Sequence, residues 1–208
     1  MSRLWDKGLP LNERVLRYTA GEDHVLDARL VSYDVQGSIA HATMLASVGL
    51  ISEGDSKAIS DGLRSLEESF DNGDWQITLE DEDVHTALET RLTHAIGDAG
   101  ARLHLGRSRN DQVLTALRLY LRDAADDLAA RVEELRKSVA SLAGRQGDVE
   151  LPGYTHMQHA MPSSVALWCG GFDEAFTDAI DGLAATKRRI NKNPVSYTHL
   201  TLPTNREV

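Results

Sequence analysis

The chain has 208 residues, of which 22 are Lys or Arg and 32 are Asp or Glu, so its formal net charge at pH 7 is −10. This excess of negative charge excludes proteins that hold a nucleic acid or an anionic membrane on a net positive face, although a local basic patch can still bind an anion. We therefore expect no nucleic acid and no membrane among its partners. Cys169 is the one cysteine, so no intrachain disulfide can form, and no Cys and His residues have zinc-site spacing. We expect no metal and no cofactor.

The two ends of the chain differ in character from the body. The first residues carry charges where a signal peptide has its apolar run, and nowhere do about 18 apolar residues follow one another, so we expect a cytoplasmic protein. Residues 195–208 (VSYTHLTLPTNREV) have no helical periodicity and resemble the translation of a sequencing adaptor. We expect them to be a non-native tail on a truncated reading frame; the alternative is a natural disordered tail.

Apolar residues at helical spacing predict most of the body to be α-helix, with almost no strand signal. Ser52 and Asp55 form a capping-box-like start for the second helix, and Gly97 ends the third. The predicted helices cover residues 26–50, 52–72, 83–96, 113–142 and 163–183.

The helix over 113–142 is the most informative about architecture. Its apolar stripe runs without proline or glycine until Gly144, and about 33 helical residues rise about 50 Å, which exceeds the width of a small domain. Such a helix needs partners along its length, which indicates an oligomeric bundle. The expected fold is all-α, with a small N-terminal helical domain over 1–106, a truncated long-helix bundle over 107–194 and the tail over 195–208.

A first polar segment, residues 106–112, reads GRSRNDQ. Ser108 followed by Asp111 predicts a helix start, where backbone N–H groups and the helix dipole favour an anion. Arg107 and Arg109 add guanidinium groups that pair with a carboxylate or phosphate. The alternative is a capped helix with solvated arginines.

A second polar segment, residues 151–162, reads LPGYTHMQHAMP and predicts an irregular loop before an apolar helix. His156 in this loop can titrate near neutral pH and transfer protons. The alternative is a structural histidine whose hydrogen bonds are satisfied.

A third segment, residues 81–89, reads DEDVHTALE and places His85 and Glu89 four residues apart on one helix face. This spacing suits a pair of ligands, but it also suits an ordinary ion pair between neighbouring turns, or an acidic helix start.

In this order the three segments resemble the argininosuccinate lyase family of the fumarase/aspartase superfamily. The resemblance covers residues 1–194, and its most specific parts are GRSRNDQV at 106–113 and GYTH at 153–156. Residues 3–5 (RLW), 34–38 (DVQGS) and 189–191 (RIN) also match. Two stretches depart from the pattern: TAGED at 19–23 stands where many members have Asn-Ala-Ser, and MQHAMP at 157–162 stands for Leu-Gln-x-Ala-Gln-Pro.

The resemblance implies a fumarase/aspartase-type fold and the anti-elimination of argininosuccinate to arginine and fumarate through a carbanion, in arginine biosynthesis. It implies a homotetramer whose sites combine segments of three subunits. It assigns His156 to the acid/base machinery, and Arg109, Asn110 and Thr155 to substrate binding. Ser108, Gln158 and His85 are further substrate-binding candidates, and the family's catalytic serine loop lies beyond residue 194.

Three alternatives remain open at this stage. Another superfamily lyase, such as adenylosuccinate lyase, shares the elimination but binds a nucleotide. A crystallin-like structural protein keeps the helical packing and not the site, and a plain helical interaction domain needs neither polar loop. If the resemblance holds, we expect residues 1–194 alone to be inactive and poorly soluble, because their bundle is incomplete.

Overall fold

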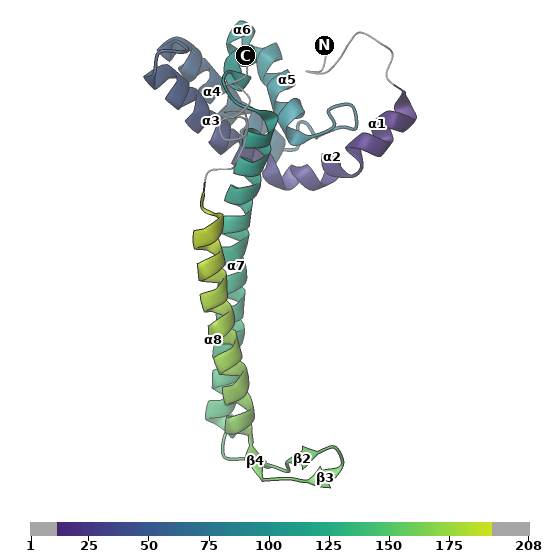
Figure 1. The fold of residues 1–208 in the computed structure, drawn as a ribbon, viewed down its shortest axis with the longest axis vertical. Helices are drawn as coiled ribbons and strands as arrows, with labels where there is room; N and C mark the ends of the chain where they lie inside the picture. The colour runs from purple at the N-terminus through teal and green to yellow at the C-terminus, as the bar shows by residue number, and fades with distance from the viewer. Residues whose placement is uncertain (1–11, 193–208) are drawn as a thin grey trace, which may run out of the picture. The chain divides into compact units, whose positions relative to one another are not determined.

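The computed structural model describes residues 12–192, which are predominantly helical and form two compact units, over residues 12–120 and 121–192 (Figure 1). The expected all-α class is confirmed. The boundary between the units falls after Tyr120, inside a helix that begins at Arg109, and not after residue 106. The domain limits 1–106 and 107–194 therefore stay a prediction. Residues 3–5 and the tail 195–208 lie outside the described part of the chain. The helices are α1 (Glu13–Ala20), α2 (Asp23–Leu26), α3 (Val31–Ser47), α4 (Glu53–Asp71), α5 (Val84–Ile96), α6 (Asp98–Ala101), α7 (Arg109–Gln146) and α8 (Val165–Ile190).

Short elements connect these helices. Two 3₁₀ turns, η1 (Asp27–Leu30) and η2 (Arg102–His104), precede α3 and α7. Four two-residue strands lie between α7 and α8, namely β1 (Glu150–Leu151), β2 (Tyr154–Thr155), β3 (Gln158–His159) and β4 (Ser163–Ser164). β1 pairs antiparallel with β4, and β2 with β3. None of the helices in residues 12–192 is long and apolar enough to cross a bilayer.

The core of the first unit lies between α3, α4 and α5, whose starts follow the capping chemistry of the sequence. The Ser52 hydroxyl accepts a hydrogen bond from Asp55 N at 3.0 Å, and the Asp83 carboxylate accepts one from Thr86 N at 2.7 Å. Each bond satisfies a backbone donor at a helix start. The fully buried members of the apolar stripes predicted for α4 and α5 are Ile59, Leu63, Val84, Leu88 and Leu92.

The helix predicted over residues 26–50 extends too far at both ends. Leu26 and Val48 are 50% and 61% exposed, because the long helix α3 occupies only residues 31–47 between them. Val31, Val35 and Leu45, within α3, are buried as expected.

The predicted long helix is confirmed and is longer than its apolar stripe. α7 has 38 residues, starts four residues before Val113 and continues through Gly144. In the second unit α8 lies antiparallel to it: Arg122 Nη1 donates to Asn191 Oδ1 at 3.2 Å, and Arg136 Nη1 donates to Thr177 Oγ1 at 3.2 Å. Lys187 and Asp126 form an ion pair between the same two helices.

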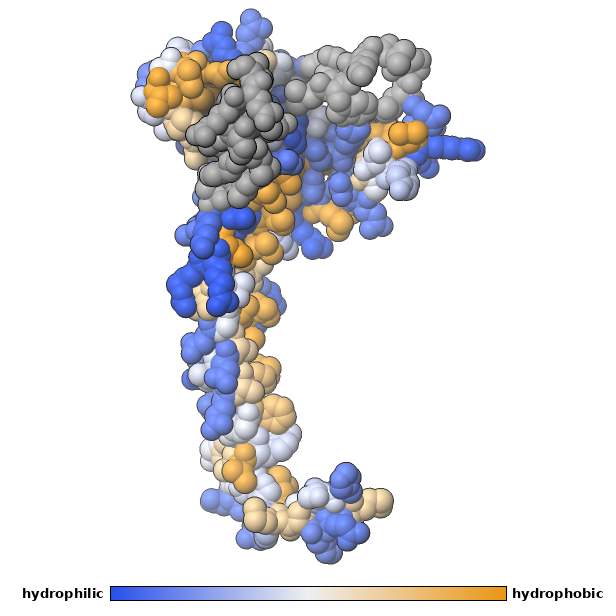
Figure 2. Space-filling view, viewed as in Figure 1, coloured by the Kyte–Doolittle hydropathy of each residue, from blue (hydrophilic) through white to orange (hydrophobic). Residues whose placement is uncertain are grey.

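The described part of the second unit leaves several large apolar side chains exposed. Cys169 is the one fully buried residue in its described part, 121–192. Leu121, Leu128 and Leu135, on the predicted stripe, are 40%, 49% and 49% exposed. Figure 2 shows hydrophobic side chains along α7 and α8. One neighbouring helix therefore does not cover this stripe.

Close packing of α6 against α5 makes Gly100 a sensitive position. A Cβ at Gly100 would lie 2.7 Å from Thr93 Cα and 2.8 Å from Thr93 N, which are backbone atoms that cannot rotate away. We expect Gly100→Ala to lower the free energy of unfolding by about 1–3 kcal/mol. Urea denaturation followed by circular dichroism measures this change.

Gly54→Ala is the matched control, because the nearest atom to its Cβ would be Ser52 Oγ at 3.7 Å. It lies in the first turn of α4, and we expect it to be neutral or to stabilise by up to about 1 kcal/mol. Equal effects of the two substitutions would show that the α5–α6 approach does not limit stability.

Candidate active site

The start of α7 is capped by its own sequence. Ser108 Oγ accepts a hydrogen bond from Asn110 N at 3.1 Å, and Asp111 Oδ2 accepts one from Ser108 N at 2.9 Å. This reciprocal pair confirms the predicted helix start. Ser108 is buried, whereas Asn110 is exposed at the amino end of the helix.

The arginines beside this cap are held by the protein. Arg109 Nη2 pairs with Glu89 Oε2 at 3.1 Å and its Nη1 donates to Gln112 Oε1 at 2.9 Å, while its side chain is 26% exposed. Arg107 Nη2 donates to Ser38 Oγ at 3.0 Å. The alternative of solvated arginines is therefore wrong. The structure joins a helix start, whose dipole favours negative charge, to two oriented guanidinium groups.

His85 lies inside the first unit and does not pair with Glu89. Its side chain is 2% exposed, and its Nδ1 lies 3.0 Å from Asp34 Oδ2 on α3. Glu89 pairs with Arg109 of α7 instead. The ion pair suggested by the four-residue spacing is wrong, because contacts to other helices satisfy both side chains.

Asp34 is a buried carboxylate surrounded by donors. Gln112 Nε2 donates to both of its oxygens at 3.0 Å, and Ser38 Oγ donates to Oδ1 at 3.1 Å. Burial alone would raise the pKa of Asp34, but the hydrogen bonds and charge of His85, followed by Gln112 and Arg107, hold it below its usual value. The carboxylate is therefore ionised at neutral pH.

The second polar segment forms a β-hairpin in the second unit. Tyr154 pairs with His159 and Thr155 with Gln158, so His156 and Met157 make a two-residue loop. His156 has φ of 55°, which matches the first position of a type II′ turn and is unusual for a residue with a Cβ. Thr155, His156 and Gln158 are all exposed.

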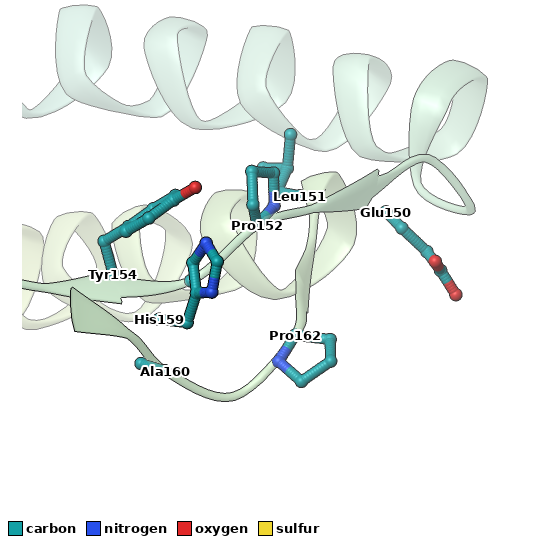
Figure 3. Close-up of a pocket in the computed structure, with 8 residues that line it drawn as sticks. Glu150, Leu151, Pro152, Tyr154, His159, Ala160 and Pro162 are labelled. Carbon is teal, nitrogen blue, oxygen red and sulfur yellow. The ribbon is translucent and has the colours of Figure 1, made fainter. Parts of the chain in front are cut away.

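The base of this hairpin encloses a small open cavity of about 380 Å³, shown in Figure 3. The rings of Tyr154 and His159 lie next to each other across the strands, with centroids 5.1 Å apart and planes tilted by 56°. Gly153 O accepts from Ala160 N at 2.8 Å, which closes the hairpin. Backbone and ring contacts thus hold the loop that carries His156.

The candidate residues therefore form two groups, each within one unit. Residues 12–120 contain His85, Ser108, Arg109 and Asn110, and residues 121–192 contain Thr155, His156 and Gln158. Their functional roles stay predictions. Within the described chain, no group of three or more His, Cys, Asp or Glu residues is placed to hold a metal ion. The sequence reasoning gave no role to Asp34 or Gln112, although a carboxylate between the buried Val31 and Val35 was a visible signal.

Comparison with known proteins identifies the family. The profile of a family described as Lyase matches residues 15–201. The chain belongs to this lyase family. It is 45% identical over 193 residues to an argininosuccinate lyase of Sorangium cellulosum and 38% identical to one of Thermotoga neapolitana. These matches cover 93% of the chain but 45% and 48% of the two relatives, so the chain spans just under half their length.

Solved structures of lyases share the fold. An EDDS lyase variant with bound fumarate matches 89% of this chain and 36% of its own with a TM-score of 0.70 and 25% identity. A class II fumarase from Schistosoma mansoni matches 88% of this chain and 44% of its own with a TM-score of 0.68 and 22% identity, which shows the fold alone. The expected fumarase/aspartase-type fold is confirmed.

The buried charge of Asp34 predicts how the stability of this chain depends on pH. Because the pKa of Asp34 is lowered in the folded state, its carboxylate stabilises that state above the pKa of an unfolded aspartate, and this contribution is lost as pH falls through the lowered pKa. Asp34→Asn removes the titration. The stability difference between wild type and variant should be largest near neutral pH and shrink below about pH 4. Urea denaturation at stepped pH measures it, and a constant difference would contradict the assignment.

Gly153 determines whether the hairpin can close. A Cβ there would lie 2.0 Å from Met161 O, so Gly153→Ala must displace the backbone. We expect the ring-current NMR shifts of Tyr154 and His159 to be lost, while the melting temperature of the first unit stays unchanged. Gly171→Ala, which meets no atom within 4 Å, is the control and should preserve these shifts. Preserved shifts in Gly153→Ala would show that the close approach is unnecessary.

Proposed function

We propose that the protein carrying these residues is an argininosuccinate lyase, which cleaves argininosuccinate to arginine and fumarate. The observation that carries the proposal is the 45% identity to an argininosuccinate lyase over 193 residues, a span that includes the polar segments 106–112 and 153–156. The EDDS lyase variant, a structural neighbour, has fumarate bound. A place in arginine biosynthesis and a cytoplasmic location are part of the same proposal.

The reaction explains the residue types at the start of α7. A base removes a proton from the carbon beside a carboxylate, the C–N bond to arginine breaks, and the leaving nitrogen gains a proton. The carbanion places extra negative charge on the carboxylate oxygens, which oriented donors must stabilise. We assign this task to Arg109 and Asn110. Ser108 and His85, which are both buried in the same unit, stay further candidates for substrate binding. The elimination is redox-neutral, and we propose no cofactor.

The hairpin carries the proposed proton-transfer group. His156 is exposed at the tip of a two-residue loop, where its imidazole is free to approach a substrate, and Thr155 and Gln158 flank it as paired neighbours. A positioned acid or base of this kind contributes about 10²- to 10⁴-fold to a rate. We assign acid/base chemistry to His156 and substrate binding to Thr155 and Gln158.

We propose a homotetramer in which the long helices of several subunits pack together and complete the site. The support is the apolar surface of the second unit. Besides the half-exposed leucines of α7, Trp168 and Phe172 of α8 are 54% and 43% exposed, although large apolar side chains gain free energy when buried. Copies of the same helices provide a matching surface.

The test uses the complete protein, expressed from the gene in source DNA read past the codon for Pro194. With argininosuccinate as substrate, we expect fumarate release in the ultraviolet and equal amounts of arginine. His156→Asn, whose short side chain tolerates the left-handed backbone, should lower kcat at least about 100-fold. His94→Asn, an exposed histidine on α5, is the control and should leave kcat unchanged.

Several results would count against the proposal. Fumarate release from adenylosuccinate and not from argininosuccinate would assign the chain to another superfamily reaction. Full activity of His156→Asn would remove the acid/base assignment, and a monomer in analytical ultracentrifugation would remove the tetramer. Fumarate release by residues 1–194 alone would show that later residues are not needed.

A further inference from the structure

The Asp34 carboxylate has no direct role in the proposed reaction, and its hydrogen bonds connect three helices. Asp34 lies on α3, His85 on α5 and Gln112 on α7, and all three side chains are 2–3% exposed. His85 Nδ1 and Gln112 Nε2 each lie 3.0 Å from Asp34 oxygens. A carboxylate so buried requires donors on every side, because an unpaired buried charge is strongly destabilising.

This single charge fixes which way its neighbours point. Gln112 turns its NH₂ group toward Asp34, so its Oε1 must point away, and there it accepts from Arg109 Nη1 at 2.9 Å. Ser38 donates its one proton to Asp34, so its oxygen is left to accept from Arg107 Nη2 at 3.0 Å. Both arginines of the 106–112 segment are therefore connected to Asp34 through one intermediate side chain.

Glu89 holds the other side of Arg109. Its Oε2 lies 3.1 Å from Arg109 Nη2, so two different terminal nitrogens of the guanidinium have fixed acceptors. A planar guanidinium with both ends held has one orientation, which suits recognition of a planar carboxylate.

We propose that Asp34 is a positioning residue that orients Arg109 through Gln112 and Arg107 through Ser38 for the carboxylates of the substrate. The identity of the substrate in this inference rests on the proposed function. The orientation of the two arginines rests on the hydrogen bonds described above. A merely structural Asp34 would hold α3, α5 and α7 together and affect stability alone.

The decisive variant is Asp34→Asn in the complete protein. The new amide carries no charge and has one acceptor oxygen where the carboxylate has two, so it cannot accept from Gln112 at both atoms, and the orientation of Gln112 toward Arg109 is no longer fixed. We expect KM for argininosuccinate to rise about tenfold, the effect of one hydrogen bond to a charged group, with a smaller change in kcat. Gln112→Met removes the connection to Arg109 together with the hydrogen bonds from Gln112 to Asp34, leaves Ser38 and Arg107 in place, and should raise KM to a similar extent. The double variant should show no further rise, because both substitutions break the same connection.

Asp81→Asn is the matched control. Asp81 is another carboxylate of the first unit, less buried than Asp34, and it accepts from Thr78 N at 2.9 Å and from Arg91 Nη1 at 3.0 Å. None of its hydrogen bonds goes to the 106–112 segment. Its substitution should lower the melting temperature and leave KM unchanged. If Asp34→Asn and Gln112→Met do the same, Asp34 is structural and the proposal is overturned.

A measurement without substrate separates this inference from the proposed function. In the complete protein without substrate, the guanidinium NMR signals of Arg107 and Arg109 should be protected from solvent exchange and lose protection in Asp34→Asn, whereas Arg91 should stay protected by Asp81. Ser38→Ala, which leaves Asp34 bonded to His85, should release Arg107 alone. Unchanged protection of Arg107 and Arg109 in Asp34→Asn overturns the positioning role, whichever substrate the complete protein cleaves.

Discussion

A negative charge placed where water cannot reach it determines the organisation of the first unit. Asp34 is 2% exposed, and its carboxylate is acceptable there because His85, Gln112 and Ser38 all donate to it. Those donors come from α3, α5 and α7, so the requirement of one side chain relates the interior of the unit to the start of the longest helix. The same hydrogen bonds leave acceptors facing Arg107 and Arg109, which joins stability and the candidate anion site.

The second unit depends on a different constraint. In its described part, the helices bury few side chains. The conformation of the hairpin follows from its backbone: Gly153 lies where the two ends of the hairpin approach, and His156 has a left-handed backbone conformation. A residue with a Cβ in this conformation stores about 1–2 kcal/mol of strain. Such strain is often found at functional sites, where the surrounding structure maintains it. The proposed acid/base group thus stands on a locally strained loop, and the proposed anion-binding arginines on a packed network.

Local signals made much of the fold predictable, and contacts between distant residues account for what was missed. The starts of α4 and α7 were correct because Ser52 and Ser108 act through neighbours within three residues. The pairs made by Asp34 with His85 and Gln112 join residues 51 and 78 positions apart, which periodicity cannot reveal. For the same reason the four-residue spacing of His85 and Glu89 was misleading. The family resemblance identified the candidate site residues without explaining how His85 is held.

The pairing of β2 with β3 has a consequence for how this segment can vary. Thr155 lies opposite Gln158, with two residues between them, and strand side chains alternate between faces with a period of two. One inserted or deleted residue in the loop would either change the turn type that orients His156 or shift the pairing by one residue, and a shifted pairing turns one member of the pair to the opposite face. Length is then constrained here as strictly as residue identity, and insertions compatible with folding belong elsewhere, such as the turn after α4.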